Sequence, residues 1–262
     1  MTTGSITGSI AGSITALTLS AVQYEALDGG VVANVPEHIR LIEDAESHGA
    51  RLVVFPELSL TGYRLDLLEG PGEWLSAADG RLDGIREICR RTGITAVVGA
   101  AFKEEDGTPR LASLAVHPAG TIETSFKTHL HGPEQGLFVA GSHPAVLEID
   151  GWKVALAICF DAARPGHAEW AAEAGADIYA VSALYTAGED HRLGLHLGAR
   201  AMDNRMFSVL ANLAGATPLG ASCGLSGFWG PDGLPFRQAA GTGTEVLTAS
   251  LQYSVLARFR RT

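Results

Sequence analysis

The segment Arg51-Leu-Val-Val-Phe-Pro-Glu57 decides the fold of this chain. Its apolar residues run from Leu52 to Phe55 without a polar break, which is typical of a strand that is buried on both faces of a sheet. Pro56 ends the run, because proline has no backbone N–H to give to a sheet. Glu57 is therefore predicted to lie directly beyond the carboxyl end of a buried strand.

The residues before this strand complete a βαβ unit. Residues 14–23 are rich in β-branched and apolar side chains and predict a first strand. Residues 34–49 predict a helix, with Asn34 as the N-cap, Pro36 in the first turn and apolar residues at helical spacing up to Gly49. A strand, a helix and a second strand in this order are typical of a parallel sheet.

Strands and helices continue to alternate along the chain. The pattern predicts helices over 79–91, 165–174 and 190–205, and strands over 94–102, 111–116, 121–126, 145–149, 153–158, 177–183 and 207–212. Turn signals at 117–120 and 150–151 join two pairs of these strands as hairpins. Short strands and Gly/Pro-rich turns are expected to fill the rest. Alternation of this kind predicts an α/β fold.

Composition limits the class of protein. Residues 1–13 are rich in Ser, Gly and Thr and predict a flexible tail, whereas 14–262 contains no linker-like stretch and predicts one domain. With 19 Lys and Arg against 29 Asp and Glu, the net charge is −10, so nucleic acid is not expected as a partner. No apolar stretch approaches the roughly 20 residues that cross a membrane. Three cysteines and a first basic residue at Arg40 favour the cytoplasm over secretion.

Three residues with reactive side chains each follow a predicted buried strand. They are Glu57, Lys127 and Cys159. Because functional sites of α/β sheets gather at the carboxyl ends of strands, we expect these side chains to converge on one edge. A carboxylate can take the proton of a thiol, the thiolate can attack a carbonyl, and an ammonium can stabilise the developing oxyanion. The set predicts covalent acyl chemistry on Cys159.

The segments around these residues resemble the nitrilase superfamily of carbon-nitrogen hydrolases. The likeness is carried by Phe55-Pro-Glu57-Leu-Ser-Leu-Thr-Gly-Tyr63, by Phe126-Lys127-Thr-His-Leu-His-Gly-Pro-Glu134 and by Ile158-Cys159-Phe-Asp161. The segment 174–178 belongs to the match around Cys159, and weaker matches follow at 199–204, 211–212 and 230–233, in the order that the family shows. Any single segment is weak support, but the ordered set is highly specific.

The resemblance implies a four-layer α-β-β-α sandwich and a Glu57-Lys127-Cys159 triad. It further implies that the family's second glutamate is Glu134 and that the backbone N–H of Phe160 helps Lys127 to form an oxyanion hole. By its strand-end position, Cys159 is also expected to have a thiol pKa lowered by Lys127 and a helix dipole. Tyr63 and Tyr185 follow predicted strands at the same edge and could shape the acyl pocket.

The resemblance implies an amidase that cleaves a small non-peptide amide through a Cys159 thioester, without metal or organic cofactor, in a homodimer or higher homo-oligomer. After Cys159, the family's usual charged, aromatic and Glu positions hold Ala163, Arg164 and Gly166. Carbamoyl amino acid hydrolases of the family place a carboxylate-binding Arg near here, and Arg164 is displaced by one position. Phe160-Asp161 in place of the Trp-Glu of true nitrilases favours an amidase.

Other interpretations stay open on the sequence alone. They are a carbamoylase, a catalytically silent binding member of the fold, and acyl transfer to an amine in place of water. The segment Gly220–Gly224 spells the G-x-S-x-G of α/β-hydrolases, but no His follows it to complete that triad. No metal-binding spacing of His and Cys occurs, and Cys89 and Cys223 are expected to be structural bystanders.

Overall fold

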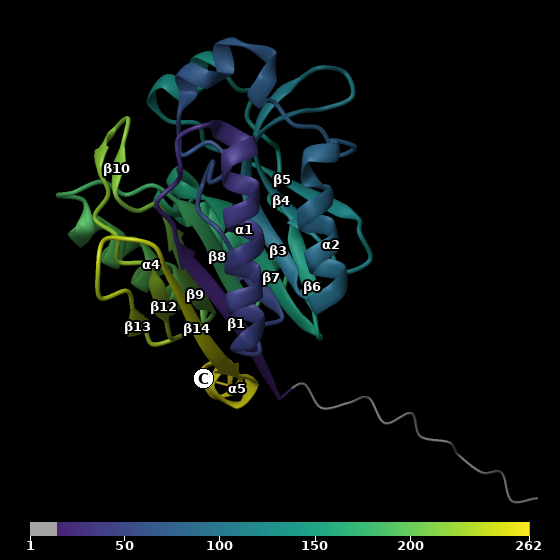
Figure 1. Cartoon of the computed structure of the whole chain (residues 1–262). Helices are drawn as coiled ribbons and strands as arrows, with labels where there is room; N and C mark the ends of the chain where they lie inside the picture. The colour runs from purple at the N-terminus through teal and green to yellow at the C-terminus, as the bar shows by residue number, and fades with distance from the viewer. Residues whose placement is uncertain (1–14, 262) are drawn as a thin grey trace, which may run out of the picture.

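The computed structural model describes residues 15–261 and contains two six-stranded sheets (Figure 1). The strands of the first sheet, in spatial order, are β14 (Glu245–Gln252), β1 (Ala16–Gln23), β2 (Leu52–Val54), β3 (Thr95–Lys103), β4 (Pro109–Val116) and β5 (Ile122–Phe126). Those of the second are β13 (Pro235–Gln238), β12 (Gly227–Trp229), β9 (Phe207–Asn212), β8 (Ile178–Ala183), β7 (Trp152–Ile158) and β6 (Val146–Ile149). A small hairpin of β10 (Ala216–Thr217) and β11 (Gly220–Ala221) stands apart.

Helices cover the outer face of each sheet, which confirms the predicted α-β-β-α sandwich. On the first sheet lie α1 (Gly30–Ser47) and α2 (Asp83–Thr92), seen in front of the strands in Figure 1. On the second lie α3 (Pro165–Glu173) and α4 (Asp190–Asn204), and α5 (Tyr253–Arg260) follows β14. The two inner faces pack against each other in a separate apolar core.

The apolar run 52–55 is buried on both faces, as predicted. Val53 and Phe55 point into the core beneath α1 and α2, whereas Leu52 and Val54 point into the core between the sheets. This division follows from the two-residue period of a strand, which sends successive side chains to opposite faces. All four residues are inaccessible to solvent.

The directions of the strands place several of their carboxyl ends at the same edge of the sandwich. β1, β2 and β3 are parallel, and β5 points the same way because it is antiparallel to β4, which is antiparallel to β3. In the second sheet, β7, β8 and β9 are parallel to one another. The carboxyl ends of β2, β5, β7 and β8 therefore carry the loops from which the candidate site is built.

Two predicted helix starts are wrong, each for a local reason. The first helix begins at Gly30, and Asn34 is not its N-cap, because the Asn34 side chain instead binds the backbone N–H and C=O of Leu27. Pro36 consequently lies inside the helix. The second helix begins at Asp83, since Asp79 caps a preceding 3₁₀ turn. The predicted tail over residues 1–13 lies outside the described residues.

The helices were also compared with the length and hydropathy of a membrane span. Within residues 15–261, no helix is both long enough and apolar enough to cross a bilayer.

Candidate active site

One cavity of about 170 Å³ lies at the carboxyl edge of the two sheets. It is lined by all the site residues that the sequence predicts: Glu57, Tyr63, Lys127, Glu134, Cys159, Phe160 and Tyr185. Glu57 and Lys127 follow β2 and β5 of the first sheet, whereas Cys159 follows β7 of the second. The cavity therefore lies where the two sheets meet, and neither sheet forms it alone.

Lys127 is the centre of a buried ionic cluster. Its Nζ donates to Oε1 of Glu57 and to Oε1 of Glu134, both at 2.6 Å, and the lysine and Glu57 side chains are fully buried. The hydroxyl of Tyr63 donates to the same Glu134 oxygen at 2.6 Å. Burial alone would lower the pKa of Lys127, but the carboxylate of Glu57 raises it well above its usual range. Lys127 is therefore a permanent cation in the wall of the cavity.

Glu57 has the electrostatic setting of a general base. Burial raises the pKa of its carboxyl to about 7, although the Lys127 ammonium opposes this rise. The oxygen Oε2 is buried and accepts no hydrogen bond from any described residue. A carboxyl that titrates near neutral pH and has a free oxygen can both accept and return a proton.

Cys159 lies at a sharp turn between β7 and a 3₁₀ turn over Cys159–Ala163. Its φ of +48° is rare for a residue with a side chain, and Sγ lies 3.7 Å from the carbonyl oxygen of Leu184. Burial, with the nearby Glu57 charge, raises the pKa of the thiol well above its usual range. The expected lowering of this pKa is wrong, because Lys127 is outweighed by burial. The surroundings of Cys159 therefore favour the neutral thiol over the thiolate.

The loop of Glu57 is fixed by close packing. Next to Glu57, Leu58 has a φ of +46°. Gly99 of β3 lies against this loop so closely that a Cβ atom there would stand 2.2 Å from the carbonyl oxygen of Pro56. Only glycine leaves room for this close approach, and the contact fixes the backbone position of Glu57.

Two aromatic side chains form the walls of the cavity. Phe160 is the second residue of the turn that begins at Cys159, where backbone N–H groups have no partner within the turn. Tyr185 follows β8; its N–H donates to Oδ1 of Asn212 at 2.8 Å, and its hydroxyl lies 3.0 Å from Nδ1 of His196. Both residues line the cavity, which agrees with the prediction that Tyr185 lies at the pocket.

The G-x-S-x-G segment supports Tyr185 from behind. Ser222 donates to the carbonyl oxygens of Tyr185 and Leu213, and Asn212 donates to its hydroxyl. Ser222 does not line the cavity. Ser222 therefore has a structural role, and the segment 220–224 does not form a second nucleophile site, as the sequence predicts.

Several residues at the mouth of the cavity were not predicted. The segment after β8 and the start of α4 provide Thr186, Glu189, Arg192 and His196. Glu189 accepts hydrogen bonds from the N–H and hydroxyl of Thr186 and pairs with Arg192 at 3.1 Å. The strand-end rule that led to Glu57 also applies to the end of β8, and it could have revealed this segment.

Arg164 does not reach the cavity. Its guanidinium lies over the ring of Phe160, 4.7 Å from the centroid, on the side of a neighbouring cavity lined by His129 and His167. The displacement of Arg164 by one residue therefore leaves its guanidinium behind Phe160, outside the active-site cavity. Among residues 15–261, no three His, Cys, Asp or Glu side chains are grouped so as to hold a metal ion.

Comparison with known proteins places the chain in a family. Residues 18–261 match the carbon-nitrogen hydrolase family, so the chain belongs to it. A nitrilase of Pyrococcus abyssi is 32% identical over 182 residues, which cover 67% of each chain. A 2-oxoglutaramate amidase of Bacillus subtilis is 28% identical over 207 residues, covering 77% of this chain and 78% of that one.

Solved structures agree with this assignment. An amidase from Nesterenkonia sp. AN1 in complex with butyramide is 25% identical, with a TM-score of 0.82 over 94% of this chain and 96% of that one. Another structure of the same amidase carries acrylamide added to its active-site cysteine. The protein is thus an enzyme of the amidase-type carbon-nitrogen hydrolases.

Proposed function

We propose that this enzyme hydrolyses the C–N bond of a small, uncharged, non-peptide amide through a thioester on Cys159. The observation that carries the proposal is the buried cluster in which Lys127 bridges Glu57 and Glu134 in the cavity of Cys159. A base, a cation and a thiol that share one small cavity supply what acyl transfer from an amide requires.

In the proposed mechanism, Glu57 takes the thiol proton of Cys159 as sulfur attacks the amide carbonyl. The ammonium of Lys127 and the N–H of Phe160 stabilise the tetrahedral oxyanion. Glu57 then returns the proton to the departing nitrogen, and ammonia leaves. Water, deprotonated by Glu57, attacks the thioester, and the carboxylic acid and free thiol are released.

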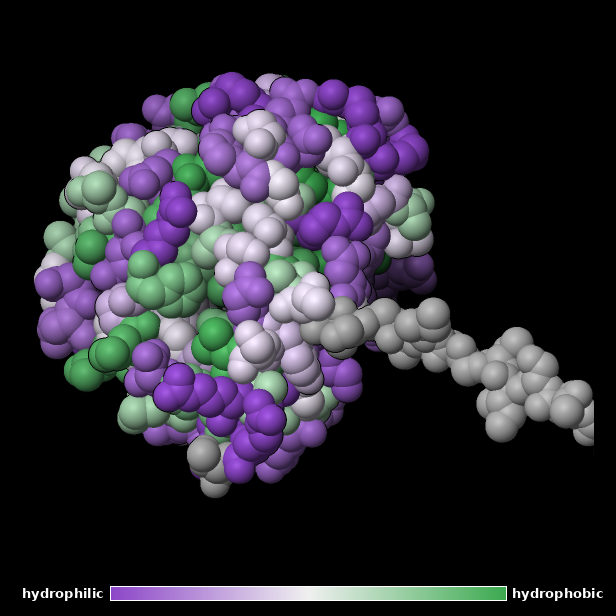
Figure 2. All heavy atoms as spheres, turned by 90° about the horizontal axis from the view of Figure 1, so that it is seen from below, coloured by the Kyte–Doolittle hydropathy of each residue, from purple (hydrophilic) through white to green (hydrophobic). Residues whose placement is uncertain are grey.

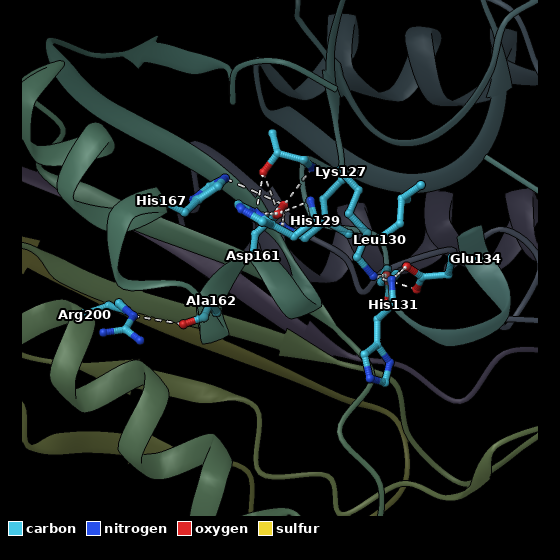
Figure 3. A network of polar contacts seen from close by, with 12 residues as sticks. Lys127, His129, Leu130, His131, Glu134, Asp161, Ala162, His167 and Arg200 are labelled. Carbon is cyan, nitrogen blue, oxygen red and sulfur yellow. Dashed lines mark hydrogen bonds and ion pairs between the residues drawn. The ribbon is translucent and has the colours of Figure 1, made fainter. Parts of the chain in front are cut away.

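Glu134 supports this chemistry by holding Lys127. It accepts hydrogen bonds from Lys127 and Tyr63 on one oxygen and from the backbone N–H of His131 on the other, at 2.8 Å. Figure 3 shows this last contact between Glu134 and His131. A carboxylate fixed from two sides directs the ammonium toward the reacting carbonyl. No metal or organic cofactor has a step in this scheme.

The size and charge of the cavity favour a short neutral substrate. Its volume of about 170 Å³ lies below the roughly 300–1,000 Å³ that is common for small-molecule pockets. Arg192 at the mouth is already paired with Glu189, and Arg164 lies outside the cavity. These features favour a simple amide over an N-carbamoyl amino acid, whose carboxylate would need an unpaired cation.

The proposal is tested by measuring ammonia release from a panel of amides. The panel contains short aliphatic amides, ω-amides of dicarboxylic acids, N-carbamoyl amino acids and nitriles. We expect the short aliphatic amides to give the highest kcat/KM, and mass spectrometry to show an acyl adduct on Cys159. Carbon dioxide released together with ammonia would identify a carbamoylase. No reaction and no adduct with any compound would favour a silent binding protein, and transfer only to added amines would favour an acyltransferase.

A second test is the pH dependence of kcat/KM, which reports groups of the free enzyme. Glu57 must be ionised to accept the thiol proton, and its pKa is about 7. We therefore expect kcat/KM to rise as pH increases through about 7. In Glu134→Gln the residual activity should show this rise at lower pH, because the charge of Glu134 raises the pKa of Glu57. An unshifted profile in that variant would contradict the assignment of the base.

We further propose that residues 14–262 form one domain that works in the cytoplasm as a homodimer or higher homo-oligomer. A reducing compartment keeps the thiol of Cys159 free. Large exposed apolar side chains support self-association: Leu195 is 69% exposed, Met202 54%, Leu234 64% and Phe236 52%. In Figure 2, hydrophobic residues are concentrated on the left of the view, the side on which α4 and β13 lie in Figure 1. Sedimentation of the purified chain measures this association.

A further inference from the structure

We propose that Asp161 is a positioning residue, which holds the turn of Cys159 and the segment after Lys127 at a fixed separation. The inference rests on the function proposed above for those two residues. Asp161 is the third residue of the turn that begins at Cys159, and it is 1% exposed. It does not line the active-site cavity, so it acts through its neighbours.

The carboxylate of Asp161 accepts hydrogen bonds from both sides of the site. On the side of Lys127, its Oδ1 accepts from the hydroxyl of Thr128 at 2.7 Å and the N–H of His129 at 2.9 Å. On the side of Cys159, its Oδ2 accepts from the N–H of Ile158 at 3.1 Å. Figure 3 shows Asp161 between the segment of Lys127 and His129 and the ring of His167.

These contacts join the two sheets at the point where the chemistry occurs. Thr128 and His129 follow β5 of the first sheet, whereas Ile158 ends β7 of the second. Lys127 and Cys159 therefore belong to different sheets, and their separation depends on how those sheets are joined at this edge. Thr128 directly follows Lys127, and Ile158 directly precedes Cys159, so the contacts of Asp161 lie next to both residues in the chain.

A carboxylate suits this position because the backbone N–H groups and the Thr128 hydroxyl that contact it are all donors. Besides the three groups above, the N–H of Thr128 lies 3.4 Å from Oδ2, and Nδ1 of His129 lies 2.9 Å from Oδ1. An asparagine of the same size would turn an NH₂ group toward N–H groups on at least one side. The mismatch would push that side away by the fraction of an ångström that matters for attack.

The other end of the turn has a separate anchor. Arg200 of α4 is buried, and its Nε donates to the carbonyl oxygen of Ala162 at 2.9 Å. Figure 3 shows this contact on the far side of the turn from Lys127. Because Arg200 holds the turn to α4, which covers the second sheet, loss of the Asp161 contacts should move the lysine segment relative to Cys159 and leave the turn folded.

The test compares Asp161→Asn with Asp177→Asn. Asp177 is also a buried carboxylate that accepts a backbone N–H, that of Lys153 at 2.9 Å, but it lies before β8, at the opposite end of the strand from the cavity. We expect kcat of Asp161→Asn to fall about 100-fold, with KM within about threefold of the wild-type value. Asp177→Asn should keep its kcat even where urea unfolding shows a similar loss of stability.

A second readout does not depend on the substrate. Iodoacetamide should alkylate Cys159 about tenfold more slowly in Asp161→Asn than in wild type. Mass spectrometry of the peptide that contains Cys159 measures this rate. If wild type hydrolyses no amide but this difference is found, the positioning role stands and the proposed function fails. Wild-type kcat and alkylation rate in Asp161→Asn, or an equal loss of kcat in Asp177→Asn, would overturn the positioning role.

Thr128→Val covers the case in which Asp161→Asn does not fold. It removes a single hydroxyl donor to Asp161 and keeps the volume of the side chain. We expect kcat to fall about tenfold, as for the loss of one hydrogen bond to a charged group. An unchanged kcat in a folded Thr128→Val protein would count against the proposal by itself.

Discussion

Cys159→Ala is expected to abolish amide hydrolysis, with kcat at least about 10⁴-fold below the wild-type value. The proposed mechanism passes through a covalent thioester, and alanine has no atom that can form it. Glu57 and Lys127 remain in place in this variant, but a base and an oxyanion site without a nucleophile lose most of their effect, since the residues act as one unit.

Ammonia release and intact-protein mass spectrometry measure this result together. The wild-type protein should gain the mass of the acyl group when it is quenched during turnover, and Cys159→Ala should gain none. Cys89→Ala is the matched control, because Cys89 lies on the buried face of α2, does not line the active-site cavity, and should keep both activity and adduct. Persistent turnover in Cys159→Ala would remove the thioester from the mechanism.

Lys127→Met should cost both activity and stability. The variant removes the ammonium that donates to Oε1 of Glu57 and to Oε1 of Glu134, and it leaves two carboxylates together in the interior. Loss of one member of a buried ion pair typically costs about 3–5 kcal/mol in the free energy of unfolding. Loss of an oxyanion donor lowers kcat by about 10²–10³-fold. Both effects have the same physical origin, an uncompensated negative charge in the cavity.

The pH dependence of stability tests this origin. Without Lys127, the pKa of Glu57 rises further above that of the unfolded chain, since Lys127 is the main group that lowers it. The folded variant then binds a proton more tightly than the unfolded chain, so it gains stability as pH falls. We expect urea unfolding to show a smaller loss at pH 5 than at pH 8. Lys153→Met, at an exposed lysine, should show no such trend.

Much of the fold can be predicted because its signals are local. The strand over 207–212 coincides with β9, and the run at 52–55 is buried on both faces as its composition indicates. Asn34 misleads because its side chain binds a loop that no local pattern reveals. The C-terminal strand β14 was expected only as one of several short strands, since its partner β1 lies at the other end of the sequence.

In the site, too, features set by neighbouring residues could be predicted, whereas features set by residues distant in the sequence could not. Glu57, Lys127 and Cys159 could be brought together because each directly follows a strand and strand ends share an edge. The direction of the Cys159 pKa could not be predicted, because it depends on burial by residues from both sheets. Arg192 and Glu189 were missed for a different reason. They lie at the N-cap and in the first turn of α4, where charged residues are common and carry little information unless the strand-end rule is also applied to β8.

The pairing of β1 with β14 has a consequence for how the chain folds. Ser20 and Thr248 share a hydrogen bond of 2.7 Å although they are 228 positions apart. The first sheet therefore stays incomplete until β14 has been synthesised and has reached β1, and folding through so distant a contact is slow. Until then one edge of β1 offers unpaired backbone groups to any neighbouring strand.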